Sequence, residues 1–404
     1  MKESFLKRTF VLMGPAFIAA VAYVDPGNFA ANFSAGAEYG YMLVWVLVAA
    51  NIMAALVQYL SAKIGIVTGK SMPEIVAEKL PRSARIMYWI QAELVAIACD
   101  IAEIIGGAIA LQLLFNIPLV AGGLITAVVS FVLLAVYRQK QTKYFERMIM
   151  GMLLVIPIGF VVGLFMQPPE PLPLLAGLIP KFSDTDSVLL ATAMLGATIM
   201  PHVVYLHSAL TRDKHGKISG SKVKSYLKAT RIDVVIAMLF AGTINLSMVI
   251  LAASALQGQA EASTLNGVYS ALGTTLSPMV ATLFAVGLLI AGFASTSVGS
   301  QAGAVIMQGL LKRSIPLFTR RLITVFPAIV ILLFGIEPTT ALIVSQIGLS
   351  FGVPFALLPL ARITASKQIM GSSVNHKYTT VAIYAIAGLV SLLNFVLIIL
   401  TVTG

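Results

Sequence analysis

Charge is scarce in this sequence. Only 11% of its 404 residues are Asp, Glu, Lys or Arg, whereas 58% are hydrophobic, and the mean hydropathy is +0.94. Soluble domains carry about 25% charged and roughly 45–50% apolar residues, so a soluble fold of this length could not cover its apolar surface. The apolar residues also gather in runs of about 20, the length that crosses a ~30 Å hydrocarbon core. We therefore expect an all-α integral membrane protein.

Cysteine is almost absent as well. The single Cys99 excludes an internal disulfide, and its place in an apolar run predicts inert packing. Neither an H-E-x-x-H nor a G-x-S-x-G pattern occurs, so an intramembrane enzyme is disfavoured. The net charge of +11 comes from basic residues between apolar runs, which indicates membrane orientation and no nucleic-acid partner.

Eleven apolar runs predict eleven transmembrane helices. Every Lys and Arg except Lys181 falls in the N-terminal arm or in alternate loops and their flanks, which predicts a cytoplasmic N-terminus and an external Gly404. We interpret the first run as a retained helix and not as a signal peptide. The expected spans are 11–36, 42–66, 87–115, 118–136, 148–166, 187–210, 232–257, 277–311, 322–336, 339–361 and 379–402.

Two of these spans carry helix-breaking residues near their middle. The first contains Asp25-Pro26-Gly27-Asn28 and the sixth contains Met200-Pro201. Because five spans separate the two breaks, the halves must cross the membrane in opposite senses, as inverted repeats of transporters do. Prolines that merely kink the helices are the alternative. The expected organisation is a first repeat at 1–166, an external Pro-rich connector at 167–186, a second repeat at 187–361, and a loop with the eleventh span at 362–404.

The first break places an acidic residue at bilayer depth. Burying Asp25 there costs at least ~2.5–3.5 kcal/mol, so we expect a functional role. Asn28 offers an amide oxygen, and the prolines deprive the carbonyls of Ala22 and Ala197 of their usual donors. These oxygens suit a hard cation, but Met200 adds a soft thioether that favours transition ions such as Mn²⁺ and Fe²⁺ over Ca²⁺ and Mg²⁺.

The third span carries an acidic stripe. Glu93, Asp100 and Glu103 lie on one helical face and predict a water path or proton relay, with Arg320 and Arg321 as candidate counter-charges. A structural ion-pair network is the alternative. His202 and His207 are candidate proton carriers, with a hydrogen-bonded interior role as the alternative. Gln346 in the tenth span is a further candidate oxygen ligand.

These motifs together resemble a known family. Asp25-Pro26-Gly27-Asn28 with Met200-Pro201-His202, supported by Tyr205–Leu210, Ile306–Gly309 and Ser345-Gln346, is similar to the signature of the Nramp family of divalent metal transporters, in its bacterial branch. The resemblance covers nearly the whole chain. It implies a LeuT-like 5+5 inverted repeat with broken helices 1 and 6.

The resemblance also implies a function. It is proton-coupled import of Mn²⁺, Fe²⁺, Cd²⁺ and similar ions by alternating access, without a cofactor, in a monomer of the bacterial inner membrane. The implied metal ligands are Asp25, Asn28, Met200 and the Ala197 carbonyl, joined in particular conformations by the Ala22 carbonyl and Gln346. The implied proton route uses His202, Glu93, Asp100, Glu103 and an arginine of the 320–321 pair.

Two other functions fit the same features. One is a Na⁺-coupled carrier of amino acids or amines, in which the unwound helices would hold the organic substrate and need no sulfur. The other is a passive metal channel, because broken helices and buried ionisable groups also suit a pore.

Overall fold

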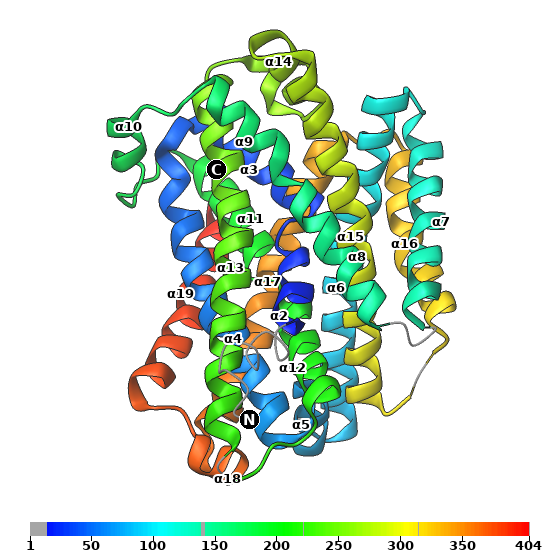
Figure 1. The fold of residues 1–404 in the computed structure, drawn as a ribbon, viewed down its shortest axis with the longest axis vertical. Helices are drawn as coiled ribbons and strands as arrows, with labels where there is room; N and C mark the ends of the chain where they lie inside the picture. Colours follow the sequence, from blue (N-terminus) through cyan, green and yellow to red (C-terminus); the bar gives the residue numbers. More distant parts are fainter. Residues whose placement is uncertain (1–13, 139–141, 221, 314, 404) are drawn as a thin grey trace, which may run out of the picture.

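The computed structural model describes residues 14–138, 142–220, 222–313 and 315–403, and across these residues the chain is helical, without a strand. Most helices run along the long axis of one bundle (Figure 1). In chain order the elements are α2 (Pro15–Ala22), α3 (Pro26–Tyr39), η1 (Gly40–Leu43), α4 (Val44–Thr68), α5 (Met72–Lys79), α6 (Arg82–Phe115), α7 (Leu119–Arg138), α8 (Thr142–Val155), α9 (Pro157–Met166), α10 (Pro171–Ala176), α11 (Thr185–Thr198), α12 (Pro201–His215), α13 (Lys222–Ala255), η2 (Ala260–Ser263), α14 (Leu265–Thr275), α15 (Pro278–Leu311), α16 (Leu317–Leu333), α17 (Pro338–Ala365), α18 (Lys367–Met370), η3 (Gly371–Ser373) and α19 (Lys377–Thr403).

Many of these helices are long and apolar enough to cross a membrane. Seven stretches of the described residues meet that standard by length and composition, and the shorter apolar helices at Leu119–Leu133 and Met150–Met166 lie among them. Large apolar side chains such as Met87, Leu239 and Phe326 stay exposed on the outside of the bundle. An apolar exterior of this kind is what lipid requires, and the fold is that of an all-α membrane protein.

The two predicted helix breaks are present. The first span divides into α2 and α3 around Tyr23–Asp25, and the sixth divides into α11 and α12 around Ile199 and Met200. In each case a proline begins the second helix, where its missing N–H is tolerated. Helix α2 packs against α12, and α3 packs against α11. The two broken helices therefore run in opposite directions through the middle of the bundle (Figure 1).

Several boundaries differ from the sequence prediction. In the fifth span, predicted at 148–166, α8 and α9 meet at Ile156, whose backbone stays helical, so Pro157 interrupts the hydrogen bonding of a helix that still covers Met150–Met166. The predicted loops contain the additional helices α5, α10, α14 and α18. Helix α13 begins at Lys222, ten residues before the predicted span, and α16 covers Leu317–Leu333 where 322–336 was expected. The predicted N-terminal arm lies outside the described residues.

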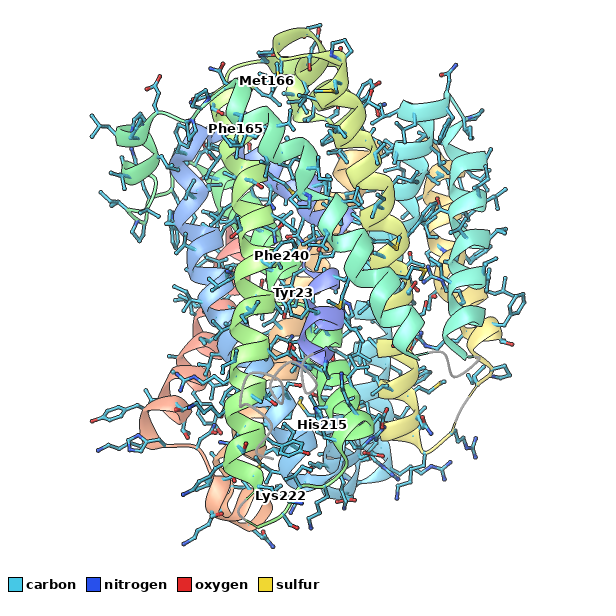
Figure 2. All side chains as sticks on the ribbon, in the orientation of Figure 1. Tyr23, Phe165, Met166, His215, Lys222 and Phe240 are labelled. Carbon is cyan, nitrogen blue, oxygen red and sulfur yellow. The ribbon has the colours of Figure 1, made fainter. Side chains whose placement is uncertain are left out.

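The two ends of the bundle differ in charge. Helices α5 and α18 lie at one end, and α10 and α14 lie at the other (Figure 1). His215 and Lys222 lie at the α5 end, whereas Phe165 and Met166 lie at the opposite end, with Tyr23 between them (Figure 2). The basic loops gather at the α5 end, which we call the basic end.

Candidate metal site

Asp25 lies in the middle of the bundle, where the chain passes from α2 to α3. Its backbone is extended (φ −87°, ψ 168°), and its side chain caps α3. Oδ1 accepts from the backbone N–H of Asn28 and from the Asn28 side-chain amide, both at 2.8 Å. Both residues are fully buried. The break therefore holds a carboxylate in the interior and fixes its direction.

Asn28 also connects the first break to the second. Its Nδ2 donates to the carbonyl oxygen of Ala197 at 3.1 Å. In an unbroken helix that oxygen would accept from residue 201, but Pro201 has no N–H. Met200 follows in the gap between α11 and α12 with an extended backbone (ψ 113°), and its side chain is fully buried. The Ala197 carbonyl oxygen therefore has no donor at residue 201 and accepts from the Asn28 side chain instead.

The Ala22 carbonyl has the same origin. Its usual donor would be the N–H of residue 26, which is Pro26. Helix α2 ends in a tight turn, in which Tyr23 and Val24 donate to Ala20 and Val21, each at 3.1 Å. The Ala22 oxygen therefore lies at the open end of α2, beside the residues that lead to Asp25.

Gln346 of α17 reaches the same carboxylate. Its Nε2 donates to Asp25 Oδ2 at 3.5 Å and to Ser345 Oγ at 3.3 Å. This approach depends on Gly27, because a Cβ added there would overlap the Gln346 amide. The glycine after Pro26 therefore provides the space through which α17 contacts the first break.

Two buried oxygens at this site have no partner among the described residues. They are Oδ1 of Asn28 and Oε1 of Gln346, and both belong to amides whose nitrogens donate to their neighbours. An unpaired buried acceptor costs about 1–3 kcal/mol, so such groups need an explanation. Beside an anionic carboxylate, acceptor oxygens of this kind can bind a cation. No group of three or more His, Cys, Asp or Glu in the described ranges is arranged to hold a metal ion, so Asp25 is a single carboxylate among neutral oxygen and sulfur atoms.

The acidic stripe of α6 pairs with two arginines of α16. Arg320 Nη2 lies 2.8 Å from Glu93 Oε1. Arg321 pairs with Asp100 and lies 3.7 Å from Glu103 Oε2. Arg321 Nε also donates to Ser130 Oγ at 3.0 Å. The predicted counter-charges are therefore confirmed as a buried ion-pair column along α6.

His202 and Cys99 lie between the second helix break and the ion-pair column of α6. Cys99 Sγ lies 3.5 Å from His202 Nε2 and 3.5 Å from Glu103 Oε1. Since His202 follows Met200 by two residues, these contacts lead from the second break to the ion-pair column. Cys99 is buried, as its place in an apolar run predicted, but its two polar neighbours were not predicted.

His207 belongs to a different group. Its Nδ1 contacts Gln58 Oε1 at 2.7 Å, and Gln58 Nε2 donates to the hydroxyl of Tyr23 at 2.5 Å. The structure brings His207 near the end of α2, away from the contacts that His202 makes. Gln58 was not predicted as a functional residue, although a polar amide inside an apolar span could have indicated one.

Two asparagines near the first break were also missed. Asn245 of α13 donates to the carbonyl of Tyr23 at 2.7 Å, and Asn32 of α3 donates to Asn245 Oδ1 at 3.0 Å. These amides supply a donor where the break removed one. Their signal was again a polar side chain in a predicted span.

Comparison with known proteins supports the resemblance. The family model described as natural resistance-associated macrophage protein-like, Nramp, matches residues 16–400. The "Divalent metal cation transporter MntH" of Mycobacterium tuberculosis strain H37Rv is 54% identical over 400 residues, covering 99% of this chain and 94% of that protein. The MntH of Bacillus subtilis strain 168 is 49% identical, covering 96% and 91%.

Solved structures agree. The manganese transporter of Eremococcus coleocola superposes with a TM-score of 0.88 at 30% identity, covering 98% of this chain and 87% of that one. Mhp1, a nucleobase-cation-symport-1 transporter, gives a TM-score of 0.59 at 15% identity, which shows a common LeuT-like fold. With helix breaks, a buried carboxylate and a match along almost its whole length, this chain belongs to the Nramp family of transporters.

Proposed function

We propose that this protein imports divalent transition-metal ions, such as Mn²⁺, Fe²⁺ and Cd²⁺, by proton-coupled alternating access. The relatives named above are metal or manganese transporters, and the family consists of transporters and not of enzymes. The substrate ion would bind between the two breaks, and no cofactor is needed.

The observation that carries this proposal is the pair of unpartnered amide oxygens beside Asp25. Asn28 Oδ1 and Gln346 Oε1 are buried acceptors without donors, and they adjoin the one carboxylate at the breaks. A divalent cation would supply what these oxygens lack. The released carbonyls of Ala22 and Ala197 would add neutral ligands, and the Met200 thioether would disfavour Ca²⁺ and Mg²⁺.

Protons would leave along α6. We place His202 and Cys99 at the start of this route, with Glu103, Asp100 and Glu93 in sequence along the ion-pair column and Arg320 and Arg321 as their counter-charges. Glu103, Asp100 and Glu93 each keep one buried oxygen without a hydrogen-bond partner in the described part of the chain, which leaves a place for a proton. His207, paired with Gln58, would respond to movement at the end of α2.

The architecture proposed for this function has eleven spans in two inverted repeats. Residues 1–166 and 187–361 form the repeats, 167–186 connect them outside, and 362–404 add the last span. The opposite directions of α2–α3 and α11–α12 support this division. We further propose a monomer in the bacterial inner membrane, with the basic end and the N-terminus in the cytoplasm and the C-terminus outside.

Metal uptake by an Asp25→Ala variant tests the site. Purified parent and variant are reconstituted in liposomes, and Mn²⁺ entry is followed with an internal fluorescent indicator. We expect uptake to be abolished, because the site loses its only anionic ligand. Asp186→Ala is the matched control, since this exposed carboxylate lies in the first turn of α11, away from the breaks. Uptake at the parent rate in Asp25→Ala would overturn the assignment.

The alternative functions are separated in the same liposomes. Competition of Mn²⁺ entry by Cd²⁺ and not by leucine supports metal transport, whereas Na⁺-driven leucine entry would favour the amino-acid carrier. An imposed pH gradient distinguishes coupled import from a passive channel. A coupled carrier accumulates Mn²⁺ when the outside is acidic, and a channel does not.

A further inference from the structure

A cavity at the basic end of the bundle lies apart from both helix breaks. It has a volume of about 430 Å³ and lies between the first turns of α6 and the last turn of α15. Three arginines, Arg82, Arg85 and Arg313, line it together with Trp89. The apolar side chains of Ile86, Leu310 and Leu311 complete the wall.

Local sequence explains why the arginines meet there. Pro81 precedes α6, so the helix begins at Arg82, and Arg85 follows three residues later on the same face. Helix α15 ends at Leu311, and Lys312 takes a left-handed conformation (φ 54°) that turns the chain. This turn carries Arg313 to the cavity that the two arginines of α6 already line.

Within the described residues none of Arg82, Arg85 and Arg313 forms an ion pair. The first turn of α6 contains no acidic residue, and its free N–H groups add partial positive charge.

Neighbouring carboxylates are already paired with other cations. Glu74 pairs with Arg212, Glu78 pairs with Lys70, and Glu93 pairs with Arg320. Orientation in the membrane requires basic residues at this end but does not require three of them to line one cavity. The three guanidinium groups are therefore available to an anion from outside the chain.

The apolar part of the cavity continues onto the surface of α6. Met87, Ile90 and Leu94 are exposed at helical spacing, with Met87 at 72% and Leu94 at 62%. Trp89 lines the cavity in the second turn of α6, and tryptophan is enriched where membrane helices meet the headgroup region. The arginines, Trp89 and the exposed apolar residues of α6 therefore follow one another along the helix. A molecule with an anionic head group and a hydrocarbon chain matches this arrangement.

We propose that this cavity binds an anionic phospholipid from the leaflet at the basic end. The phosphate diester lies among Arg82, Arg85 and Arg313, where guanidinium groups can bind its oxygens in pairs. One acyl chain follows Ile86 and Ile90 along α6. Basic pockets between transmembrane helices recognise lipid headgroups in this manner. The proposal does not depend on which substrate the transporter carries.

Retention of phosphatidylglycerol by the full chain tests the proposal. The protein is purified from mixed micelles of phosphatidylglycerol and phosphatidylcholine, and bound lipid is counted by native mass spectrometry. One variant carries Arg82→Gln, Arg85→Gln and Arg313→Gln. The control carries Lys217→Gln, Lys222→Gln and Lys224→Gln, which removes three exposed charges from the same end of the molecule. We expect the arginine variant to lose its preference for phosphatidylglycerol by at least about tenfold, while the control keeps it.

A second variant separates the cavity from general surface charge. Leu311→Trp fills the cavity without changing the net charge, so it should also release phosphatidylglycerol, and it serves if the triple arginine variant does not fold. Equal loss in the arginine and lysine triple variants would show non-specific attraction and overturn the proposal, as would full retention in the arginine variant or in Leu311→Trp. Excess inorganic phosphate should not displace the lipid. Displacement by phosphate would identify a site for a soluble anion and reject the lipid.

Discussion

The side chain of Asn28 donates a hydrogen bond to the backbone carbonyl of Ala197, and this contact joins the two broken helices across the centre of the bundle. The same amide donates to Asp25, so one side chain couples the carboxylate to both breaks. The position of the Asp25 carboxylate therefore depends on the contact between α3 and α11.

Replacing Asn28 should weaken both the site and the junction. Asn28→Ala removes a candidate ligand and two buried hydrogen bonds, so we expect at least about tenfold weaker Mn²⁺ binding, equivalent to ~1.4 kcal/mol, together with a lower Tm. Isothermal titration and thermal unfolding in detergent measure the two effects. Unchanged Mn²⁺ affinity in a folded variant would exclude Asn28 as a ligand.

Met200 should set the choice of metal. In Met200→Ala we expect Mn²⁺ uptake to continue at a reduced rate, while Ca²⁺ and Mg²⁺ become competitors, because the remaining ligands are oxygens. Met194→Ala is the matched control, since Met194 is equally buried in α11 but lies outside the break. If selectivity stays the same in Met200→Ala, or changes equally in the control, the thioether has no part in selection.

Gly27 should be sensitive to one methyl group. In Gly27→Ala the new Cβ would overlap the Gln346 amide, so the Gln346 side chain must move from its position beside Asp25, and Mn²⁺ transport should fall by about tenfold or more. In a Gln346→Ala background the Gly27→Ala change should have little further effect, because the side chain that the new Cβ would overlap is no longer present. A double-mutant cycle measures this coupling, and simple additivity of the two losses would contradict the proposed approach.

Asp100 should affect protons more than metal. Asp100→Asn keeps the shape of the side chain but removes the charge that Arg321 pairs with, so we expect slower proton flux and nearly unchanged Mn²⁺ binding. Loss of stability is also expected, because breaking a buried pair costs about 3–5 kcal/mol. A pH-sensitive dye inside the liposomes reports proton entry. Proton entry at the parent rate would remove Asp100 from the route.

The α5–α12 contact should weaken in acid. Partial burial raises the pKa of Glu74, but hydrogen bonds from the backbone N–H of Ser71 and from Arg212, both at 2.6 Å, outweigh it and leave that pKa below its ordinary value. The charged form therefore stabilises the fold above the unfolded pKa of about 4.3, and the gain is lost as pH falls through the lower folded value.

Glu74→Gln isolates that contribution. Since Glu74 is partly exposed, we expect a loss of about 1 kcal/mol or less at neutral pH, and the difference in Tm between parent and variant should shrink as pH falls below 4. A Tm difference that is constant across this range would show that the charge of Glu74 has no role. Glu78→Gln provides the control for an exposed ion pair on the same helix.

The sequence was informative where backbone chemistry decides the structure. Pro26 and Pro201 have no N–H, so the breaks and the released carbonyls followed from residue identity alone. The spacing of Glu93, Asp100 and Glu103 predicted a common face, and the arginines of α16 lie against it.

Contacts between distant helices were not predictable in the same way. Cys99 lies next to His202 only because α6 and α12 pack at that height, and Gln58 reaches His207 for a similar reason. The interruption of hydrogen bonding at Pro157 in the fifth span was not predicted, although a proline inside a span is its usual cause. The helices in the loops were missed because short polar segments carry weak periodicity.

The carbonyl oxygens of Ala22 and Ala197 also determine which substitutions should impair this site. A backbone oxygen is the same in every amino acid, so substitutions at Ala22 or Ala197 that fit the available space would leave that atom in place. What leaves these two carbonyl oxygens without their usual donors is the proline four residues further on, which has no N–H. We therefore expect substitutions at Pro26 and Pro201 to impair transport more than substitutions at Ala22 and Ala197 that fit the available space.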